Sequence, residues 1–295
     1  MTRPDHHDGS AGTDVWGRGT NNLRLRVLSA AVLAPVVLAN TYIGGWFFLA
    51  LCAAAAAGIL WEWTSLVVHG ADPRILVPGL AALLAAMVLA GLDLPEDAFG
   101  MIALGAVLAG LVVRVWADQP ASASPAWAVG GVLYAGATLL GPALLRRDLQ
   151  WGLTALLFLY ATVWATDIFA FFCGRGIGGP PLWPRISPHK TWSGAIGGLA
   201  GGVAAGVAVA YTFGVGKLGI IGVMALVLSV LAQAGDLFES AVKRHFGAKD
   251  ASRLIPGHGG LMDRLDGFLV AAFAALIIGI LRQGTGAPAR GLLIW

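Results

Sequence analysis

The chain has 295 residues, of which 57% are hydrophobic and only 12% are charged. A soluble domain carries about twice that charged fraction, so the composition excludes an ordinary soluble enzyme, and the apolar content excludes a disordered chain. The formal net charge of +3 is too small to indicate a nucleic-acid partner. Because a membrane span needs about 20 apolar residues, the chain has room for about nine, which predicts an all-α polytopic integral membrane protein.

The apolar stretches follow one another with short connections. Residues 1–22 are polar and rich in Gly, Asp and Thr, which predicts a disordered tail. The predicted spans cover residues 24–42, 45–68, 75–92, 99–117, 126–145, 151–173, 194–214, 218–239 and 264–281. The seventh is rich in glycine, and small residues let helices approach closely in lipid. We expect one transmembrane domain over residues 23–281 and a short C-terminal tail over residues 282–295.

The Lys and Arg residues indicate how the chain crosses the lipid bilayer. With a cytoplasmic N-terminus, most of the 19 Lys and Arg residues fall on the cytoplasmic side, in agreement with the positive-inside rule. Arg146 and Arg147 are exceptions, because they fall on the opposite side. The distribution predicts that the N-terminal tail and the two most highly charged connections face the cytoplasm.

The connection between the eighth and ninth spans is the more informative of these two. Asp236 lies near the end of the eighth span, and Asp263 and Asp266 open the ninth. A hairpin that returns to the same side can bring Asp236 and Asp263 together, at membrane depth, where each carboxylate costs about 2.5–3.5 kcal/mol. A divalent cation would offset both this cost and their repulsion. Carboxylates without paired His or Cys suit Mg²⁺ or Mn²⁺, so Asp236 and Asp263 are candidate metal ligands.

The same connection also suits a phosphate-rich ligand. Lys243, Arg244 and Lys249 can neutralise phosphoryl oxygens. Residues 256–260, Pro-Gly-His-Gly-Gly, let the backbone approach a ligand and present N–H groups to an anion. Surface ion pairs in a positive-inside loop would explain the basic residues. They would not explain acids at two span ends or a histidine among glycines.

The second charged connection follows Asp167, which lies late in the sixth span. An acid at the end of a span is a candidate functional residue, although a carboxylate paired with Arg175 would also explain it. Ser187, Lys190 and Thr191 offer two hydroxyls and a cation ahead of the seventh span. The dipole at the N-terminus of that helix would favour a phosphate there.

Glu62 lies between two tryptophans near the end of the second span. Tryptophans at this position are typical of interfacial anchors. An aromatic anchor and a functional acid are equally good interpretations of this segment.

Together these motifs resemble the phosphatidate cytidylyltransferase family, also called CDP-diacylglycerol synthases. The family signature is Ser-x-x-Lys-Arg, four residues, Lys-Asp, a short spacer, Pro-Gly-His-Gly-Gly, two residues and Asp-Arg-x-Asp, and residues 240–266 match it without a gap. The runs 235–240, 167–192, 26–30 and 61–63 are also similar, so the resemblance covers about residues 24–281. Two departures, the absence of a basic residue from 178–183 and Ser193 in place of Glu or Gln, concern secondary substrate contacts.

The resemblance implies a metal-dependent nucleotidyltransferase of phospholipid biosynthesis, which converts CTP and phosphatidic acid to CDP-diacylglycerol and pyrophosphate. It implies Mg²⁺, with Mn²⁺ as the alternative, a site on the cytoplasmic face of a bacterial inner membrane, and a homodimer. The catalytic residues that it implies are Asp236, Lys243, Arg244, Lys249, His258 and Asp263, with Asp236 and Asp263 as metal ligands. The substrate-binding residues that it implies are Asp167, Arg175, Ser187, Lys190, Thr191, Ser240, Gly259, Gly260, Arg264 and Asp266.

Three alternatives remain open at this point. A CTP-dependent lipid kinase of related architecture would release CDP rather than pyrophosphate. An ion-coupled transporter would suit intramembrane acids, but these acids cluster at one face rather than at the midplane. A non-catalytic descendant of the enzyme would explain the departure at residues 178–183.

Overall fold

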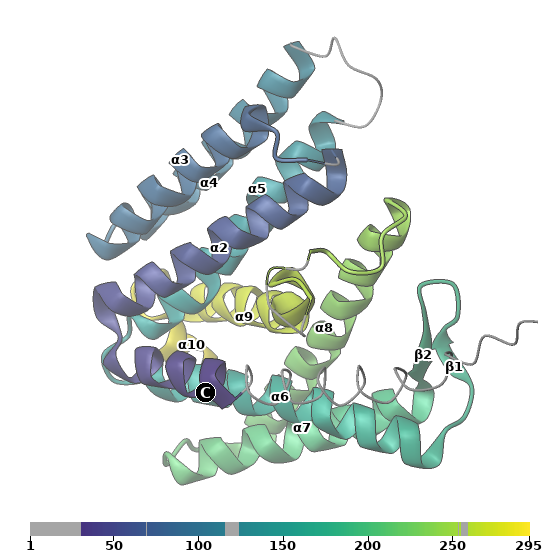
Figure 1. Ribbon diagram of the computed structural model, residues 1–295. Coiled ribbons are helices and arrows are strands. Elements are labelled where there is room, and N and C mark those ends of the chain that lie inside the picture. The colour runs from purple at the N-terminus through teal and green to yellow at the C-terminus, as the bar shows by residue number, and fades with distance from the viewer. Residues whose placement is uncertain (1–30, 69, 116–123, 253, 255–258) are drawn as a thin grey trace, which may run out of the picture.

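The computed structural model describes residues 31–68, 70–115, 124–252, 254 and 259–295, and all of its long elements are helices (Figure 1). They are α2 (Gly45–Val68), α3 (Pro73–Gly91), α4 (Pro95–Val115), α5 (Pro125–Arg146), α6 (Gly152–Ile177), α7 (Trp192–Thr212), α8 (Leu218–His245), α9 (Met262–Gln283) and the short α10 (Pro288–Leu293). A further apolar helix, Ala31–Ile43, precedes α2. The predicted tail 1–22 and the start of the predicted span 24–42 lie outside the described residues.

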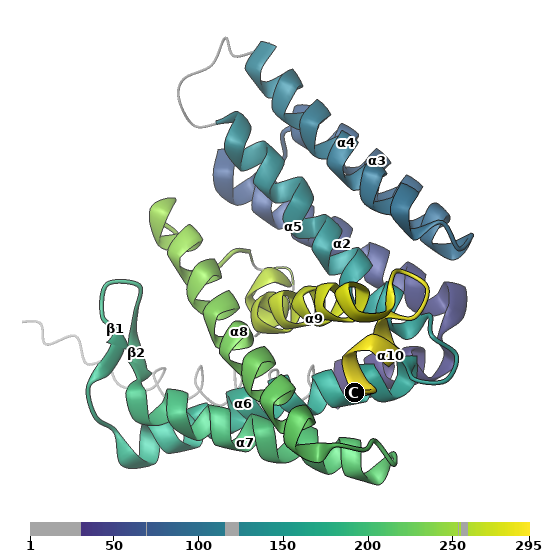
Figure 2. The same ribbon diagram turned by 180° about the vertical axis from the view of Figure 1, so that it is seen from behind.

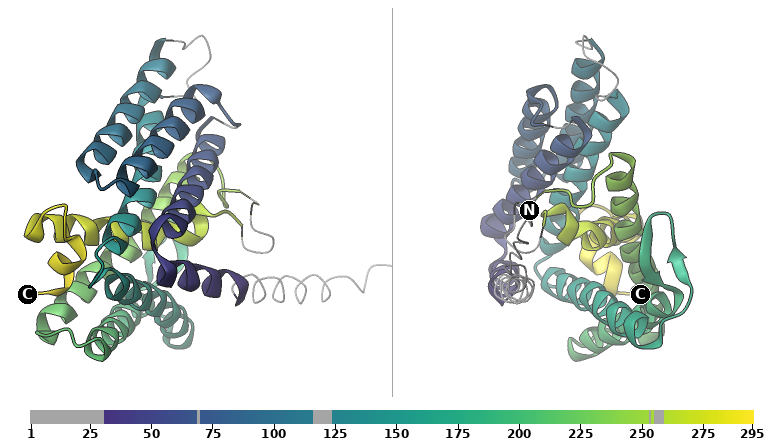
Figure 3. Two further views of the ribbon diagram at one scale, coloured as in Figure 1. Left: turned by 90° about the vertical axis from the view of Figure 1, so that its left-hand side faces the viewer. Right: turned by 45° about the vertical axis from the view of Figure 1, so that its right-hand side comes forward.

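Eight helices, α2 to α9, are long and apolar enough to cross a membrane. This confirms the predicted all-α polytopic membrane fold for the described part of the chain. Helices α2–α5 form one group and α6–α8 a second, and α9 lies between them (Figures 1 and 2). Two further views show the same division (Figure 3).

The two arginines that the predicted orientation places on the side with few basic residues both have local partners. The Nε and Nη2 atoms of Arg146 donate to the carbonyls of Thr41 and Tyr42, at 2.6 and 3.0 Å. Arg147 forms an ion pair with Asp93, at 2.7 Å. Arg146 therefore satisfies carbonyls at the end of the helix Ala31–Ile43, which have no partner within that helix. These local partners account for cationic residues in a connection where the sequence rule disfavours them.

The connection between α6 and α7 contains an antiparallel hairpin of β1 (Pro181–Trp183) and β2 (Ser187–Thr191). The sequence alone predicts no strands in this segment. Prolines in both strands are the reason, because proline cannot donate to a strand ladder and weakens any strand prediction. Helices α6 and α8 also extend past their predicted ends at 173 and 239, so Asp167 and Asp236 lie within helices rather than at their ends.

Glycines of α7 let α6 approach so closely that backbone meets backbone. A Cβ atom on Gly198 would lie 2.8 Å from the carbonyl oxygen of Thr166, and one on Gly194 would lie 2.8 Å from that of Ala170. The hydroxyl of Thr166 also lies 2.6 Å from that of Ser229, which joins α6 to α8. This packing fixes the turn of α6 that carries the next residue, Asp167.

The C-terminal residues pack back onto α9. The Nη2 atom of Arg282 donates to the carbonyl of Ile294 at 3.1 Å, and its guanidinium lies 3.4 Å from the ring centroid of Trp295. Leu292 and Leu293 of α10 are fully buried. The last residues of the chain are thus part of the packed structure.

We predict that Gly198→Ala destabilises the protein by about 1–3 kcal/mol, because the added methyl group meets a backbone carbonyl that cannot move away. Gly100→Ala in α4 is the matched control, because a Cβ atom there has no neighbour within 4 Å. Thermal unfolding in detergent measures both. Equal unfolding temperatures for the two variants would contradict the close contact between α6 and α7.

Candidate active site

A polar cavity of about 860 Å³ lies where α6, α8, α9 and the β1–β2 hairpin meet. Predicted site residues that line it are Asp167, Arg175, Ser187, Lys190, Thr191, Asp236, Lys243, Asp263, Arg264 and Asp266. The structure therefore joins the two charged connections, which are far apart in the sequence, in one site.

Other predicted residues lie outside the lining of this cavity. Arg244 and Lys249 are exposed, and the Nη1 atom of Arg244 donates to the carbonyl of Ala248 at 3.1 Å. Ser240 is half-buried on α8, and His258 lies outside the described residues. Gly259 and Gly260 lie beside the carboxylate of Asp263.

The cavity is also lined by polar residues that the sequence analysis does not assign to the site: His189, Gln233 and Asp250. Gln233 precedes Asp236 by three residues, so extending the helical face by one turn would have included it. His189 and Asp250 lie directly beside predicted residues within the two motifs.

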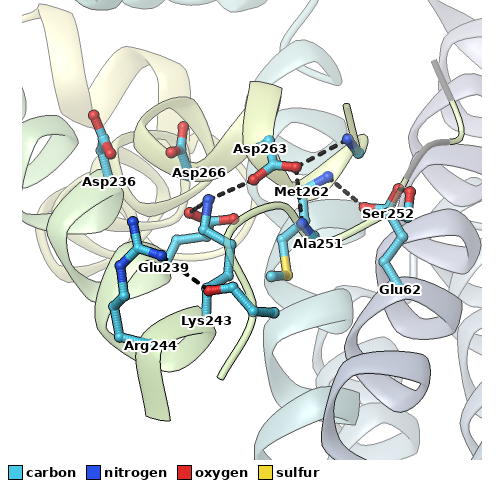
Figure 4. Close-up of polar contacts among 12 residues, drawn as sticks. Glu62, Asp236, Glu239, Lys243, Arg244, Ala251, Ser252, Met262, Asp263 and Asp266 are labelled. Atoms are coloured by element: carbon cyan, nitrogen blue, oxygen red, sulfur yellow. Dashed lines mark hydrogen bonds and ion pairs between the residues drawn. The ribbon is translucent and has the colours of Figure 1, made fainter. Parts of the chain in front are cut away.

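The crossing of α8 and α9 brings two carboxylates together. A Cβ atom on Gly235 would lie 2.7 Å from the carbonyl oxygen of Asp266, and one on Gly267 would lie 2.9 Å from that of Ala232. Only glycine permits this approach, and each glycine adjoins an acid. Asp236 and Asp266 consequently lie near each other (Figure 4).

Asp167 joins this pair from α6, and the three carboxylates repel one another electrostatically. Asp236 forms an ion pair with Lys190 of the hairpin, which supplies the nearest positive charge. Three acids from three helices therefore line the cavity together, and a cation from the hairpin contacts one of them.

Lys243 lies between two further carboxylates. Its Nζ atom is 2.6 Å from Oε2 of Glu239, one turn earlier on α8, and 2.5 Å from Oδ1 of Asp263 on α9 (Figure 4). Only 1% of the Glu239 side chain and 12% of the Lys243 side chain are exposed. The ion pair with Lys243 therefore compensates the charge of the buried Glu239 carboxylate.

Asp263 is held by donors on both of its oxygens. Besides Lys243 on Oδ1, its Oδ2 atom accepts the backbone N–H groups of Ala251 at 3.0 Å and Gly260 at 2.9 Å. Gly259 adopts a φ of +86°, which glycine permits at no steric cost. The N–H group of Gly260, predicted to face a substrate anion, thus donates to a carboxylate of the protein itself.

The hairpin is fixed to the start of α7 by hydroxyl groups. Thr191 is the N-cap of α7, and its Oγ1 atom accepts the N–H of Gly194 at 3.1 Å. Ser193, one of the two departures from the family pattern, donates to the carbonyl of Gly178 and lies 3.0 Å from the Thr191 hydroxyl. This position therefore ties the hairpin to the end of α6.

The donor types of the cavity fit Mg²⁺ or Mn²⁺. Among the described residues, no group of three or more His, Cys, Asp or Glu side chains is arranged as a metal centre. Mg²⁺ is commonly held by one or two carboxylates, with water and substrate phosphates as its other ligands. Asp236 is 36% exposed and faces the cavity with Asp167 and Asp266 nearby, which suits a shared site of this kind.

The fold and the cavity define a polytopic membrane protein with a charge-rich site between helices. Residues 24–281 match the cytidylyltransferase family, and the chain belongs to this family, which confirms the resemblance. It is 41% identical over 262 residues to the phosphatidate cytidylyltransferases of Brucella abortus (strain 9-941) and Brucella suis biovar 1 (strain 1330), which covers 88% of this chain and 94% of each relative. The phosphatidate cytidylyltransferase of Staphylococcus aureus (strain COL) is 45% identical over 120 residues, 40% of this chain and 46% of that protein.

We predict that Lys243→Met lowers the free energy of unfolding by about 3 kcal/mol, because it leaves Glu239 and Asp263 buried without their cation. SDS titration of the detergent-solubilised protein, without divalent cations, measures this loss. Lys249→Met, at an exposed lysine nearby, is the matched control and should change stability by less than about 0.5 kcal/mol.

The added substitution Glu239→Gln should recover part of the stability lost in Lys243→Met, because it removes one of the two uncompensated charges. Equal stability of the Lys243→Met and Lys249→Met variants would show that the buried ion pairs do not matter.

Proposed function

We propose that this protein is a phosphatidate cytidylyltransferase, which joins CTP and phosphatidic acid to form CDP-diacylglycerol and pyrophosphate. The observation that carries the proposal is the single cavity lined by both halves of the family motif, on helices long enough to cross a membrane. A lipid substrate can reach such a site with its acyl chains in the bilayer. The family match favours this reaction over the lipid kinase and the transporter.

The reaction needs charge compensation more than it needs a base. A phosphate oxygen of phosphatidic acid, already anionic at neutral pH, attacks the α-phosphorus of CTP, and the bond from that phosphorus to the pyrophosphate oxygen breaks. Two polyanions must therefore meet in one cavity. Fixed cations lower this barrier by stabilising the charge on the leaving pyrophosphate.

The chain offers cations from several elements of the cavity. Lys243 of α8 and Arg264 of α9 would bind the phosphates of CTP, and Lys190 of the hairpin and Arg175 of α6 would bind the lipid phosphate. The N-terminus of α7, which Thr191 caps, also favours an anion through the helix dipole. Arg244, Lys249 and Ser240, which lie outside the cavity lining, stay predicted substrate contacts, as does His258, which lies outside the described residues.

The charge of the cavity supports a divalent cation as cofactor. Its lining includes five carboxylates, at 167, 236, 250, 263 and 266, and four cationic groups, at 175, 190, 243 and 264. Among the described residues of the lining, carboxylates therefore outnumber cations, so a polyanionic nucleotide would meet acids as well as cations there. Asp236 and Asp263 would hold Mg²⁺, or Mn²⁺ as the alternative, with Asp167 and Asp266 as further oxygen donors. The bound metal would neutralise the nucleotide phosphates.

The positive-inside pattern supports a site that faces the cytoplasm, where CTP is made, in the inner membrane of a bacterium. The homodimer that the family resemblance suggests stays a prediction.

We predict that the purified protein in mixed micelles converts CTP and phosphatidic acid to equal amounts of CDP-lipid and pyrophosphate. EDTA should abolish both products, and added Mg²⁺ should restore both. Release of CDP in place of pyrophosphate would support the lipid kinase instead. Full activity in EDTA would contradict the metal-dependent mechanism.

We also predict that Asp263→Asn lowers turnover by about 100-fold or more, because it removes a charge that Lys243 and the proposed metal both need. Because both oxygens of Asp263 accept donors, the amide also costs stability, so turnover is expressed per amount of folded protein in the membrane. Asp97→Asn, an exposed acid in the first turn of α4, is the control and should retain full turnover. Retained activity in Asp263→Asn would exclude its role as a ligand.

A further inference from the structure

A buried carboxylate reaches the signature segment from a helix that is remote in the sequence. Glu62 of α2 is 0% exposed. Its Oε1 atom accepts the hydroxyl of Ser252 at 2.6 Å and the N–H of Leu261 at 2.7 Å, and its Oε2 atom accepts the N–H of Met262 at 2.6 Å (Figure 4). The Glu62 carboxylate therefore contacts both sides of the connection between α8 and α9.

The shape of α2 matches this segment as well. Gly58 lies one turn before Glu62, and a Cβ atom there would lie 2.9 Å from the Leu261 side chain. A Cβ atom on Gly260 would lie 2.9 Å from Oε1 of Glu62 and 3.0 Å from Oδ2 of Asp263. Residues 260–262 thus pack against one face of α2. Gly58 and Gly260 allow the close approach, and Glu62 accepts the hydrogen bonds.

Glu62 also supplies what the start of α9 lacks. The N-cap residue of α9, Leu261, has no side chain that can accept a hydrogen bond from the first N–H groups of the helix. Glu62 accepts two of these donors from outside the helix. Its negative charge at the helix N-terminus is stabilised by the helix dipole.

These contacts flank the residue that the proposed reaction depends on. Asp263 follows Met262 directly, and its Oδ2 atom accepts the N–H of Ala251, the residue before Ser252. Glu62 and Asp263 therefore accept hydrogen bonds from the same two segments of the connection, residues 251–252 and residues 260–262. A shift at Leu261 or Met262 would change the direction in which Asp263 faces Lys243.

We propose that Glu62 is a positioning residue of the active site, which acts by fixing the start of α9 and thereby the orientation of Asp263. The proposal rests on the proposed function only where it predicts an effect on turnover. The hydrogen-bonding role of Glu62 can be tested without any activity.

The test is Glu62→Gln, which keeps the shape of the side chain but replaces one acceptor oxygen with an NH₂ group. Because each carboxylate oxygen accepts a backbone N–H, the amide must oppose one of them. We expect kcat for CTP to fall by about 10- to 100-fold, with KM for CTP changed by less than about 3-fold, because the site is misaligned rather than emptied.

Two further variants calibrate this result. Ser252→Ala removes one of the three donors to Glu62 and leaves both backbone contacts, so we expect kcat to fall by less than about 5-fold. Glu96→Gln makes the same chemical change at an exposed acid of α4, whose partner is Thr285, and should leave kcat and KM unchanged.

Hydrogen–deuterium exchange separates the positioning role from the proposed reaction. In Glu62→Gln the amides of residues 260–263 should exchange at least about 10-fold faster than in the wild type, while those of α6 and α7 stay protected. Faster exchange throughout the protein would indicate general destabilisation and overturn the proposal, as would a wild-type kcat in Glu62→Gln. If even the wild type gives no product, the proposed function fails, and local exchange at residues 260–263 alone then decides the role of Glu62.

Discussion

The carboxylate of Asp263 is the interaction on which the site depends. It joins Lys243 of α8, Ala251 of the following connection and Gly260, two residues before α9. A carboxylate at membrane depth is stable only when donors or cations compensate its charge. The chain meets this requirement with three donors from three segments, and the same contacts close the connection between α8 and α9. The hydrogen bonds that compensate the charge of Asp263 therefore also hold together the segments that line the cavity.

Close helix contacts make this arrangement possible. Gly198 brings α7 against α6, and Gly235 and Gly267 bring α8 against α9. In lipid, helices gain little from burying apolar surface against each other, so close approach of small residues has to supply the packing energy. Each of these crossings lies within one turn of a cavity acid. Replacing one glycine would separate two helices and move the carboxylate beside it.

The sequence was sufficient for the parts of the site that depend on local spacing. Helical periodicity placed Asp236 and Lys243 on one helix, and a hairpin that returns to the same side placed Asp263 opposite them. It could not predict the role of Glu62, because its partners Leu261 and Met262 are 199 and 200 positions away and contribute only backbone N–H groups. Almost every residue type has a backbone N–H group, so the sequence does not reveal which of these groups donates to Glu62.

Two other features, the β1–β2 hairpin and the position of Arg146, also depend on contacts that the residue types do not reveal. The β1–β2 hairpin depends on a register between strands that contain proline, and the sequence gives no alternating pattern from which to predict it. Arg146 contradicts the positive-inside pattern because its partners are carbonyl groups at the end of another helix. The positive-inside rule describes the average distribution of Lys and Arg over many proteins. At a single position, specific hydrogen bonds can stabilise an arginine that the rule disfavours.

The pairing of charges in the cavity suggests how the site can accept polyanions without holding uncompensated charge beforehand. Lys190 is paired with Asp236, and Lys243 with Glu239 and Asp263. Phosphate groups that bind these cations would release the carboxylates, and a divalent cation that arrives with the nucleotide would bind the carboxylates released. Each of these fixed charges would then exchange one partner for another, so that no cation or carboxylate of these pairs would be left without a partner. Glu239, which is too buried to take part in the exchange, keeps Lys243 near the site while its other partner changes.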